Sequence, residues 1–219
     1  MKTRLLMLLS VFMAITSVGW MQAQSITYYK TGSGSGGTGT EQDPIVKISL
    51  DEILGDANAK TESDSIVVSL SNGDYTAASG TFPITKSGIS IIGTDSNKVV
   101  IKSPFDITLS EKGNISFSSL QIAATTATGR GLVDIKSSNT TVSFLDVKLN
   151  IEGAGTADGG STTCFGIVSQ LEVDNNTVNF VASHMYMSKG FQRGLCFRDG
   201  AGHTLNMENS KIDGPAGAS

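Results

Sequence analysis

One alternating pattern occurs four times between Gly113 and Ile212, and it constrains the fold more than any other feature of the sequence. Each copy has an apolar anchor, a polar residue, and then Phe in three copies or Met in the fourth. The anchors and their partners are Ile115 and Phe117, Val142 and Phe144, Val178 and Phe180, and Leu205 and Met207. Alternation at period two is typical of strands with one buried face. Because repeats of about 20–50 residues are typical of solenoids, the pattern predicts stacked strands.

The spacing of the copies predicts a parallel β-helix. Consecutive anchors lie 27 residues apart, except that the segment 153–161 lengthens the second copy. A second motif, glycine followed by two apolar residues, occurs late in three copies, at Gly131, Gly166 and Gly194. One copy therefore contains three short strands, and each coil lies about 4.8 Å above the last. We expect the three Phe side chains and Met207 to form an internal column. A sharp bend between two of the strands is expected in every copy, near Ser119, Asp146, Ala182 and Asn209.

The segment before the repeats predicts a cap for the first coil. Ser49 and Glu52 have the spacing of a capping box, which marks the start of a helix of about ten residues. Ile53, Leu54 and Ala57 give this helix an apolar side. A helix in this position would cover the strand edges and the core of the first coil.

The chain divides into a leader, an N-terminal region and a run of coils. Residues 1–24 contain a basic start, a short apolar run and a small residue at the cleavage point, which is the pattern of a secretory signal peptide. Residues 25–64 hold a strand, a Gly-rich loop and the capping helix. Residues 65–219 hold about six coils, and the pattern is still in phase at Ile212. We therefore expect a β-helix that is truncated or continues at the C-terminus, or whose last coil is covered by an oligomer or partner chain.

Charge and cysteine content narrow the classes of partner and location. The formal net charge is −4, and an acidic chain without basic clusters is not suited to nucleic acid. The apolar run of the leader is too short for a membrane span, so we expect none after cleavage and a secreted, periplasmic or cell-surface location. Cys164 and Cys196 would lie on adjacent coils but about four residues, roughly 13 Å, apart along the strands. That separation exceeds the roughly 7 Å Cα limit for a disulfide, so the two thiols are not expected to bond.

Several N-terminal segments together resemble a known family. Tyr28 and Tyr29 precede a glycine loop, Asp43-Pro44 precedes the predicted helix, and Ile84–Gly93 reads ITKSGISIIG. This opening resembles that of secreted proteins of the pectin-lyase-like superfamily, and the leader's ending, MQAQ, resembles bacterial signal peptides. The resemblance covers nearly the whole mature chain. It implies an all-β fold, a right-handed parallel β-helix of about six coils with a short N-terminal capping helix.

The resemblance also implies a function and a place for it. In the family's enzymes the saccharide cleft lies on the outer face of the first sheet, which here contains the three glycine motifs. The implied partner is a polysaccharide, acidic if the chain is lyase-like, with calcium as cofactor in that case. The candidate catalytic residues on this face are Arg130, Asp134, Asp158 and Arg193. A carboxylate pair beside an arginine would serve calcium-assisted proton abstraction next to a uronic acid carboxylate, although no metal ligands are assigned.

The sequence departs from the family's enzymes, and this leaves two functions open. Gly202-His203-Thr204 lacks the second glycine of the polygalacturonase GHG motif, and the paired aspartate motifs are absent. In the alternative interpretation, the arginines are solvated and the aspartates cap turns. A row of the third sheet is either a solvated face or a contact for an acidic glycan: Gln121, Lys148, His184 and Lys211. The chain is then either a secreted β-helix for polysaccharide binding or degradation, or a non-catalytic adhesin-type solenoid, because fold alone does not decide function.

Overall fold

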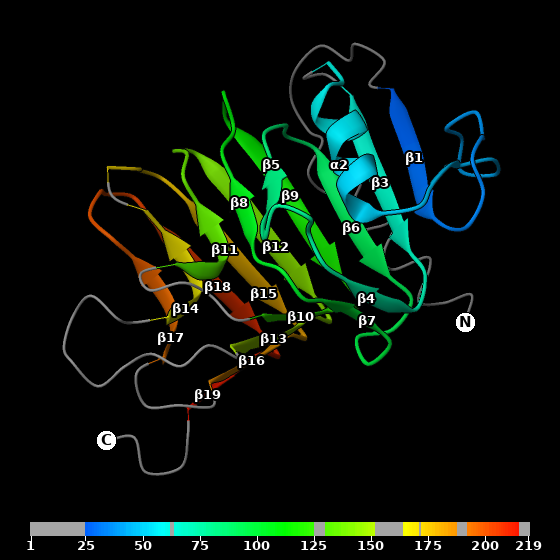
Figure 1. Cartoon of the computed structure of the whole chain (residues 1–219). Helices are drawn as coiled ribbons and strands as arrows, with labels where there is room; N and C mark the ends of the chain where they lie inside the picture. The colour runs from blue at the N-terminus through cyan, green and yellow to red at the C-terminus, as the bar shows by residue number, and fades with distance from the viewer. Residues whose placement is uncertain are drawn as a thin grey trace.

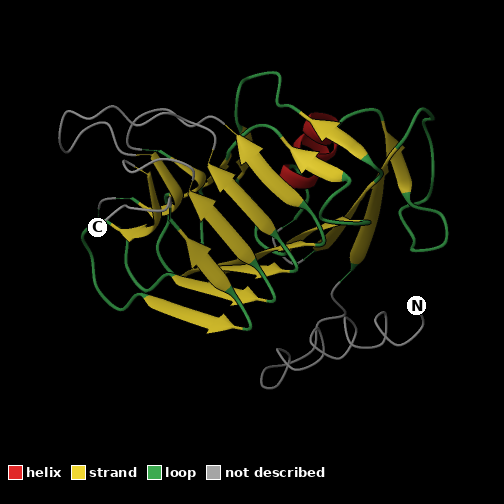
Figure 2. Cartoon of the chain, turned by 90° about the horizontal axis from the view of Figure 1, so that it is seen from below, coloured by secondary structure: helices red, strands yellow, loops and turns green. Residues whose placement is uncertain are grey.

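The chain folds as a right-handed parallel β-helix, as the repeats predict. The structure is a computed structural model that describes residues 25–61, 64–124, 130–151, 164–170, 172–187 and 192–214. The predicted leader lies outside these residues. Within the sheets, neighbouring strands run parallel, and their arrows point the same way (Figures 1 and 2). No helix in the described part of the chain is long and apolar enough to cross a membrane.

Three sheets form the walls of the β-helix. The largest has eight strands, in spatial order β18 (Thr204–Glu208), β15 (Thr177–Val181), β12 (Thr140–Leu145), β9 (Gly113–Ser118), β6 (Ile89–Gly93), β3 (Ser65–Leu70), β1 (Ile26–Thr31) and β2 (Ile45–Lys47). The second has six, β19 (Lys211–Asp213), β16 (His184–Met187), β13 (Lys148–Ile151), β10 (Gln121–Ala124), β7 (Val99–Ile101) and β4 (Gly73–Tyr75). The remaining sheet, which contains the three glycine motifs, has five strands: β17 (Gln192–Phe197), β14 (Cys164–Ser169), β11 (Gly131–Ile135), β8 (Phe105–Ile107) and β5 (Phe82–Ile84).

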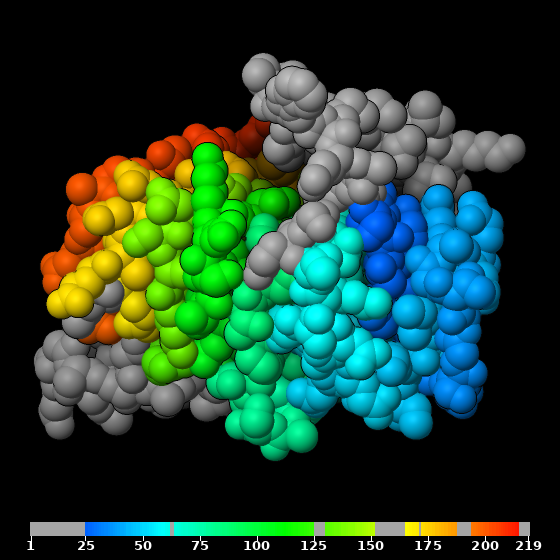
Figure 3. Space-filling model, turned by 90° about the horizontal axis from the view of Figure 1, so that it is seen from above, coloured from blue at the N-terminus to red at the C-terminus, as the bar shows by residue number. Residues whose placement is uncertain are grey.

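Each coil takes one strand from each sheet in turn, beginning with β3, β6, β9, β12 and β15, and β18 and β19 start a sixth coil. The space-filling view shows this order along the axis, from the N-terminal residues at one end to the last coil at the other (Figure 3). The bend between the first two strands falls where the sequence predicts it. Ser119, Asp146, Ala182 and Asn209 all have a positive φ, between 49° and 53°.

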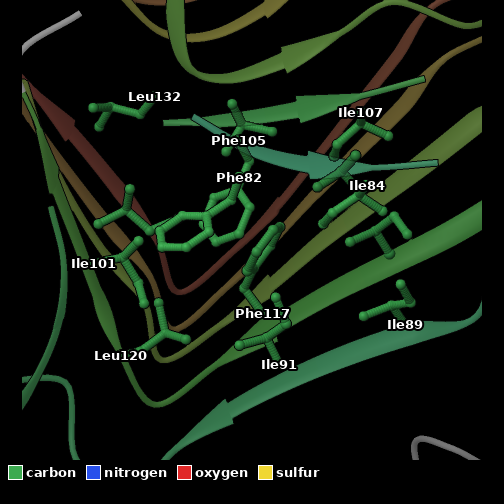
Figure 4. Packing of buried hydrophobic residues seen from close by; sticks show 14 of the residues in the cluster. Phe82, Ile84, Ile89, Ile91, Ile101, Phe105, Ile107, Phe117, Leu120 and Leu132 are labelled. Carbon is green, nitrogen blue, oxygen red and sulfur yellow. The ribbon is translucent and has the colours of Figure 1, made fainter. Parts of the chain in front are cut away.

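Aromatic rings stack along the axis inside the β-helix. Phe117 and Phe144 have ring centroids 5.4 Å apart, and Phe144 and Phe180 are 5.0 Å apart, both in stacked geometry. Phe82 and Phe105 extend the column on the opposite wall, packed among aliphatic side chains (Figure 4). The column therefore has more members than the alternating pattern alone predicts.

Met207 departs from the expected column. Its Cα is the register partner of Phe180, as predicted, but 43% of its surface is exposed, whereas Phe180 is buried. No described strand pairs with the outer edge of β18, so the packing that encloses the three Phe side chains is absent on one side of Met207.

The predicted cap is present as helix α2 (Leu50–Asn58). Ser49 is its N-cap, and the Ser49 hydroxyl accepts a hydrogen bond from the Glu52 N–H. The helix buries its apolar side, including Ile53 and Leu54, against β1, β2 and β5. It therefore covers core that would otherwise meet water at the first coil.

The register of the five-stranded sheet differs from the glycine alignment at one place. Gly166 and Gly194 lie at the same position of neighbouring strands, but Gly131 is the partner of Phe165, one residue earlier. Val133 pairs with Ile167, which places two buried side chains beside each other. Burial of apolar side chains therefore sets the register here, and glycine does not.

The cysteine register agrees with the prediction. Cys164 pairs with Gln192, whereas Cys196 pairs with Val168, so the two cysteines are staggered along the strands. Cys196 is a free thiol.

Candidate functional site on the outer face of the five-stranded sheet

Two aspartates lie side by side on the outer face of the five-stranded sheet. Asp106 of β8 and Asp134 of β11 are register partners on neighbouring coils. Like charges directly opposite each other in a sheet are destabilising. The pair therefore needs cations to balance it.

Arg130 and Lys136 supply those cations from the two ends of β11. The Arg130 guanidinium lies between the carboxylates, with its Nη2 donating to Asp106 Oδ1 at 2.5 Å and its Nε in contact with Asp134 Oδ2. Lys136 Nζ donates to the other oxygen of Asp106 at 2.7 Å. One arginine thus links two coils, and Asp106 is held by two cations.

Asp134 is the enclosed member of the cluster. Only 1% of its surface is exposed, and its Oδ1 accepts from the Gly131 N–H at 3.2 Å and from Gln170 Nε2 at 2.9 Å. Its Oδ2 meets Arg130 at ion-pair distance but has no partner in hydrogen-bond geometry. The Gln170 Oε1 accepts in turn from Arg198 Nη1 at 3.2 Å, which extends the network to the coil of β17.

The two aspartates differ in their affinity for a proton. Burial raises the pKa of Asp134, and the charge of Arg130 and the hydrogen bonds from Gln170 and Gly131 offset this only in part. Burial also raises the pKa of Asp106, but hydrogen bonds from Lys136 and Arg130 outweigh it, so that the Asp106 pKa lies below its ordinary value. Asp106 is therefore a stable anion, whereas Asp134 is the carboxyl that takes up a proton more readily.

The cations of the cluster are more accessible than its enclosed carboxylate. Asp134 is too enclosed to touch a ligand from outside, while Arg130 is 37% exposed and Lys136 and Arg198 are partly exposed. The described residues contain no group of three or more His, Cys, Asp or Glu side chains that could hold a metal ion. The cluster presents three cations: Arg130 and Lys136 are held by the two carboxylates, and Arg198 is held by Gln170.

The structure brings together two of the four residues predicted for this site. Arg130 and Asp134 are in contact. Asp158 lies outside the described residues, and Arg193 lies in β17 beside Phe165 with a side chain that is not described. No described contact therefore joins either residue to the pair.

Four members of the cluster were not among the site residues predicted from the sequence: Asp106, Lys136, Gln170 and Arg198. The signal for Asp106 was present, because aligning Phe105 with Val133 as inward-facing residues places Asp106 beside Asp134. No comparable pattern marks Lys136 or Gln170, which join through side-chain length and not through strand register.

The basic row predicted for the third sheet is confirmed as a row of neighbours on the six-stranded sheet. Gln121 pairs with Lys148, Lys148 with His184, and His184 with Lys211.

The contrast between the two aspartates predicts opposite responses to pH. Asp106→Asn should lower the free energy of unfolding by roughly 1–2 kcal/mol at neutral pH, because it removes two charged hydrogen bonds. Because the pKa of Asp106 is lower in the folded state, Asp106 stabilises the fold at pH values above the unfolded pKa of 3.8. This stabilisation is lost as the pH falls through the folded-state pKa, so the cost of Asp106→Asn should vanish in acid. Asp134→Asn should cost less at neutral pH, because the Asp134 pKa is raised. Urea unfolding across pH checks both, and a larger neutral-pH loss for Asp134→Asn would contradict the assignment.

Comparisons of the chain with family models, with curated proteins and with solved structures find no significant match.

Proposed function

We propose that this chain is a secreted β-helix protein that binds an acidic polysaccharide on the outer face of the five-stranded sheet. The observation that carries the proposal is the set of partly exposed cations, Arg130, Lys136 and Arg198, fixed in place by Asp106, Asp134 and Gln170. Side chains that are already ordered lose less conformational entropy on binding. The cluster holds three positive and two negative charges, on a chain whose net charge is −4. A carboxylated or sulfated glycan matches this excess.

The resemblance of the N-terminal segments to the pectin-lyase-like superfamily supports the same face and the same class of partner. We also propose that the chain belongs to that superfamily, comes from a bacterium and is located in the periplasm or at the cell surface. Degradation of the glycan is the less favoured version, because Asp134, the one carboxyl with a raised pKa in the described part of the chain, is enclosed.

A non-catalytic structural solenoid is the second candidate. The observation that favours it is the mutual pairing inside the cluster, since both carboxylates already have cationic partners. In this case the network would serve to hold neighbouring coils together and would bind no glycan.

Affinity electrophoresis of the purified protein through gels with polygalacturonate or with neutral dextran distinguishes the two. We expect retardation by polygalacturonate alone, weaker at high salt because salt screens exposed charges. Lys136→Gln and Arg198→Gln should each weaken retardation several-fold, because each removes one contact charge. Lys112→Gln, which removes an exposed lysine before β9, is the matched control and should change nothing.

Two outcomes would change the proposal. Equal migration in both gels would overturn glycan binding and leave the structural solenoid as the function of this chain. Ultraviolet absorbance from unsaturated uronic products, abolished by Asp134→Asn, would replace binding with lyase activity.

A further inference from the structure

The last coil of the β-helix has an open edge on each of the three sheets. β18, β19 and β17 are the outermost strands of their sheets, and no described strand pairs with their outer edges. At the other end of the β-helix, helix α2 packs against β1, β2 and β5 and covers the first coil (Figure 1). An open strand edge presents unpaired N–H and C=O groups to which another chain can add a strand.

The same end of the β-helix exposes side chains of a kind that the preceding coil buries. Leu205 and Met207 are 40% and 43% exposed, whereas their register partners Val178 and Phe180 are 0% and 2% exposed. An apolar surface of this kind marks an interaction site. We define the open end as the apolar residues of β17, β18 and β19 that continue the inward-facing rows of the three sheets: Leu195, Phe197, Leu205, Met207 and Ile212.

The backbone of β18 determines which groups face the open edge. The Thr204 N–H and the Glu208 carbonyl both form hydrogen bonds with the preceding coil. Because the backbone polar groups of successive residues in a strand point to opposite sides, those of Asn206 also face the preceding coil. The N–H and C=O groups of Leu205 and Met207 therefore point away from it. Two donors and two acceptors, placed symmetrically about Asn206, are presented to a further strand.

We infer that the open end binds the open end of a second copy of this chain, with the two β18 strands antiparallel about a two-fold axis at Asn206. In this register Leu205 of each copy lies opposite Met207 of the other, so that the same surface meets itself, as a two-fold interface requires. Each such pair exchanges two backbone hydrogen bonds, because the polar groups of both residues face the interface. Head-to-tail stacking of the copies is disfavoured, because helix α2 covers the first coil.

The outward-facing side chains of β18 fit the same register. Asn206 lies opposite itself across the axis, and an amide can both donate and accept a hydrogen bond there. Glu208 lies opposite Thr204 of the second copy, so a hydroxyl donor meets the carboxylate and no like charges face each other. A slip of one residue would place the apolar Leu205 opposite the charged Glu208 and exchange the two faces of the strand. The sequence of β18 is therefore complementary to itself in one register.

The mass of the purified protein in solution tests this inference. Light scattering should give the mass of two chains, falling towards one chain on dilution. Met207→Lys should raise the dissociation constant of the dimer about tenfold or more, because it places an unpaired charge in an apolar interface. Circular dichroism should show that this variant is folded, since Met207 is already 43% exposed in the single chain. Ile48→Lys adds the same charge at a side chain that is 74% exposed beside helix α2, and this control should leave the dimer unchanged.

A cysteine on the predicted axis tests the register. In a background with Cys164→Ser and Cys196→Ser, Asn206→Cys should form a disulfide between two chains under a mild oxidant. Residues opposite each other in a pair without backbone hydrogen bonds have Cα atoms about 4.5 Å apart, within the range of disulfides. Asn179→Cys in the same background is the control, because Asn179 is the register partner of Asn206 one coil further in. Its two copies would lie roughly 14 Å apart, which is too far to bridge.

Three results would overturn the inference. The first is a protein that stays a single chain throughout the concentration range of the light-scattering measurement. The second is a dimer that Met207→Lys leaves intact, because the contact would then lie elsewhere on the molecule. The third is equal crosslinking of Asn206→Cys and Asn179→Cys, which would show random collision in place of a fixed register. A dimer that Met207→Lys dissociates and that crosslinks at position 206 alone would support the inference.

Discussion

Phe144→Ala is expected to lower the free energy of unfolding by roughly 3–5 kcal/mol, the usual cost of removing a large aromatic side chain from a core. Phe144 is 1% exposed and stacks on Phe117 on one side and Phe180 on the other. Its removal would leave a cavity in the middle of the aromatic column. The stacked strands restrict collapse around that cavity, because the spacing of neighbouring strands is fixed by backbone hydrogen bonds.

Urea unfolding followed by circular dichroism measures this loss. Lys148→Ala is the matched control, because Lys148 lies four residues away on the outer face, where substitutions usually stay within about 0.5 kcal/mol. Equal losses for the two variants would show that the inward and outward assignments of this coil are wrong.

Arg130→Gln is expected to have the second largest effect, roughly 3 kcal/mol at neutral pH. Removing one partner of a buried ion pair leaves the other charge uncompensated, and such changes cost about 3–5 kcal/mol. We expect the low end, because Arg130 is partly exposed while Asp134 is enclosed. The double variant Arg130→Gln/Asp134→Asn should recover most of the loss, because the buried negative charge is then gone.

The pH dependence of Arg130→Gln provides an independent test. The charge of Arg130 lowers the pKa of Asp134, so its removal should raise that pKa further above 3.8. A group whose folded-state pKa is raised binds its proton more tightly when folded, so stability increases as pH falls through that pKa. The difference from the unchanged protein should therefore shrink on acidification. A loss that is constant with pH would show that Arg130 acts through packing alone.

Much of the fold could be predicted from the sequence because a β-helix repeats a local rule. Alternation at Ile115 and Phe117 fixes which face of a strand is buried, and the next copy repeats it at the height of one coil. The capping helix was likewise predictable, since the pairing of Ser49 with Glu52 depends on residues three apart. The register at Gly131 was not, because the choice between glycine and apolar alignment depends on how Val133 packs.

The candidate site was harder to predict from the sequence, for a related reason. Arg130 and Asp134 are four residues apart and could be named together, but their partners come from other coils. Whether Arg130 reaches Asp106 depends on side-chain geometry, which no local pattern encodes.

The unequal length of the coils has a consequence for how such a protein can diversify. Val142 and Val178 are 36 residues apart and Val178 and Leu205 are 27 apart, yet both pairs are register neighbours in the same sheet. Much of the difference falls between β13 and β14. Insertions and deletions at that corner therefore leave the strand ladders and the core in phase. Natural or engineered insertions can therefore change the surface of one coil without altering the strands of the neighbouring coils.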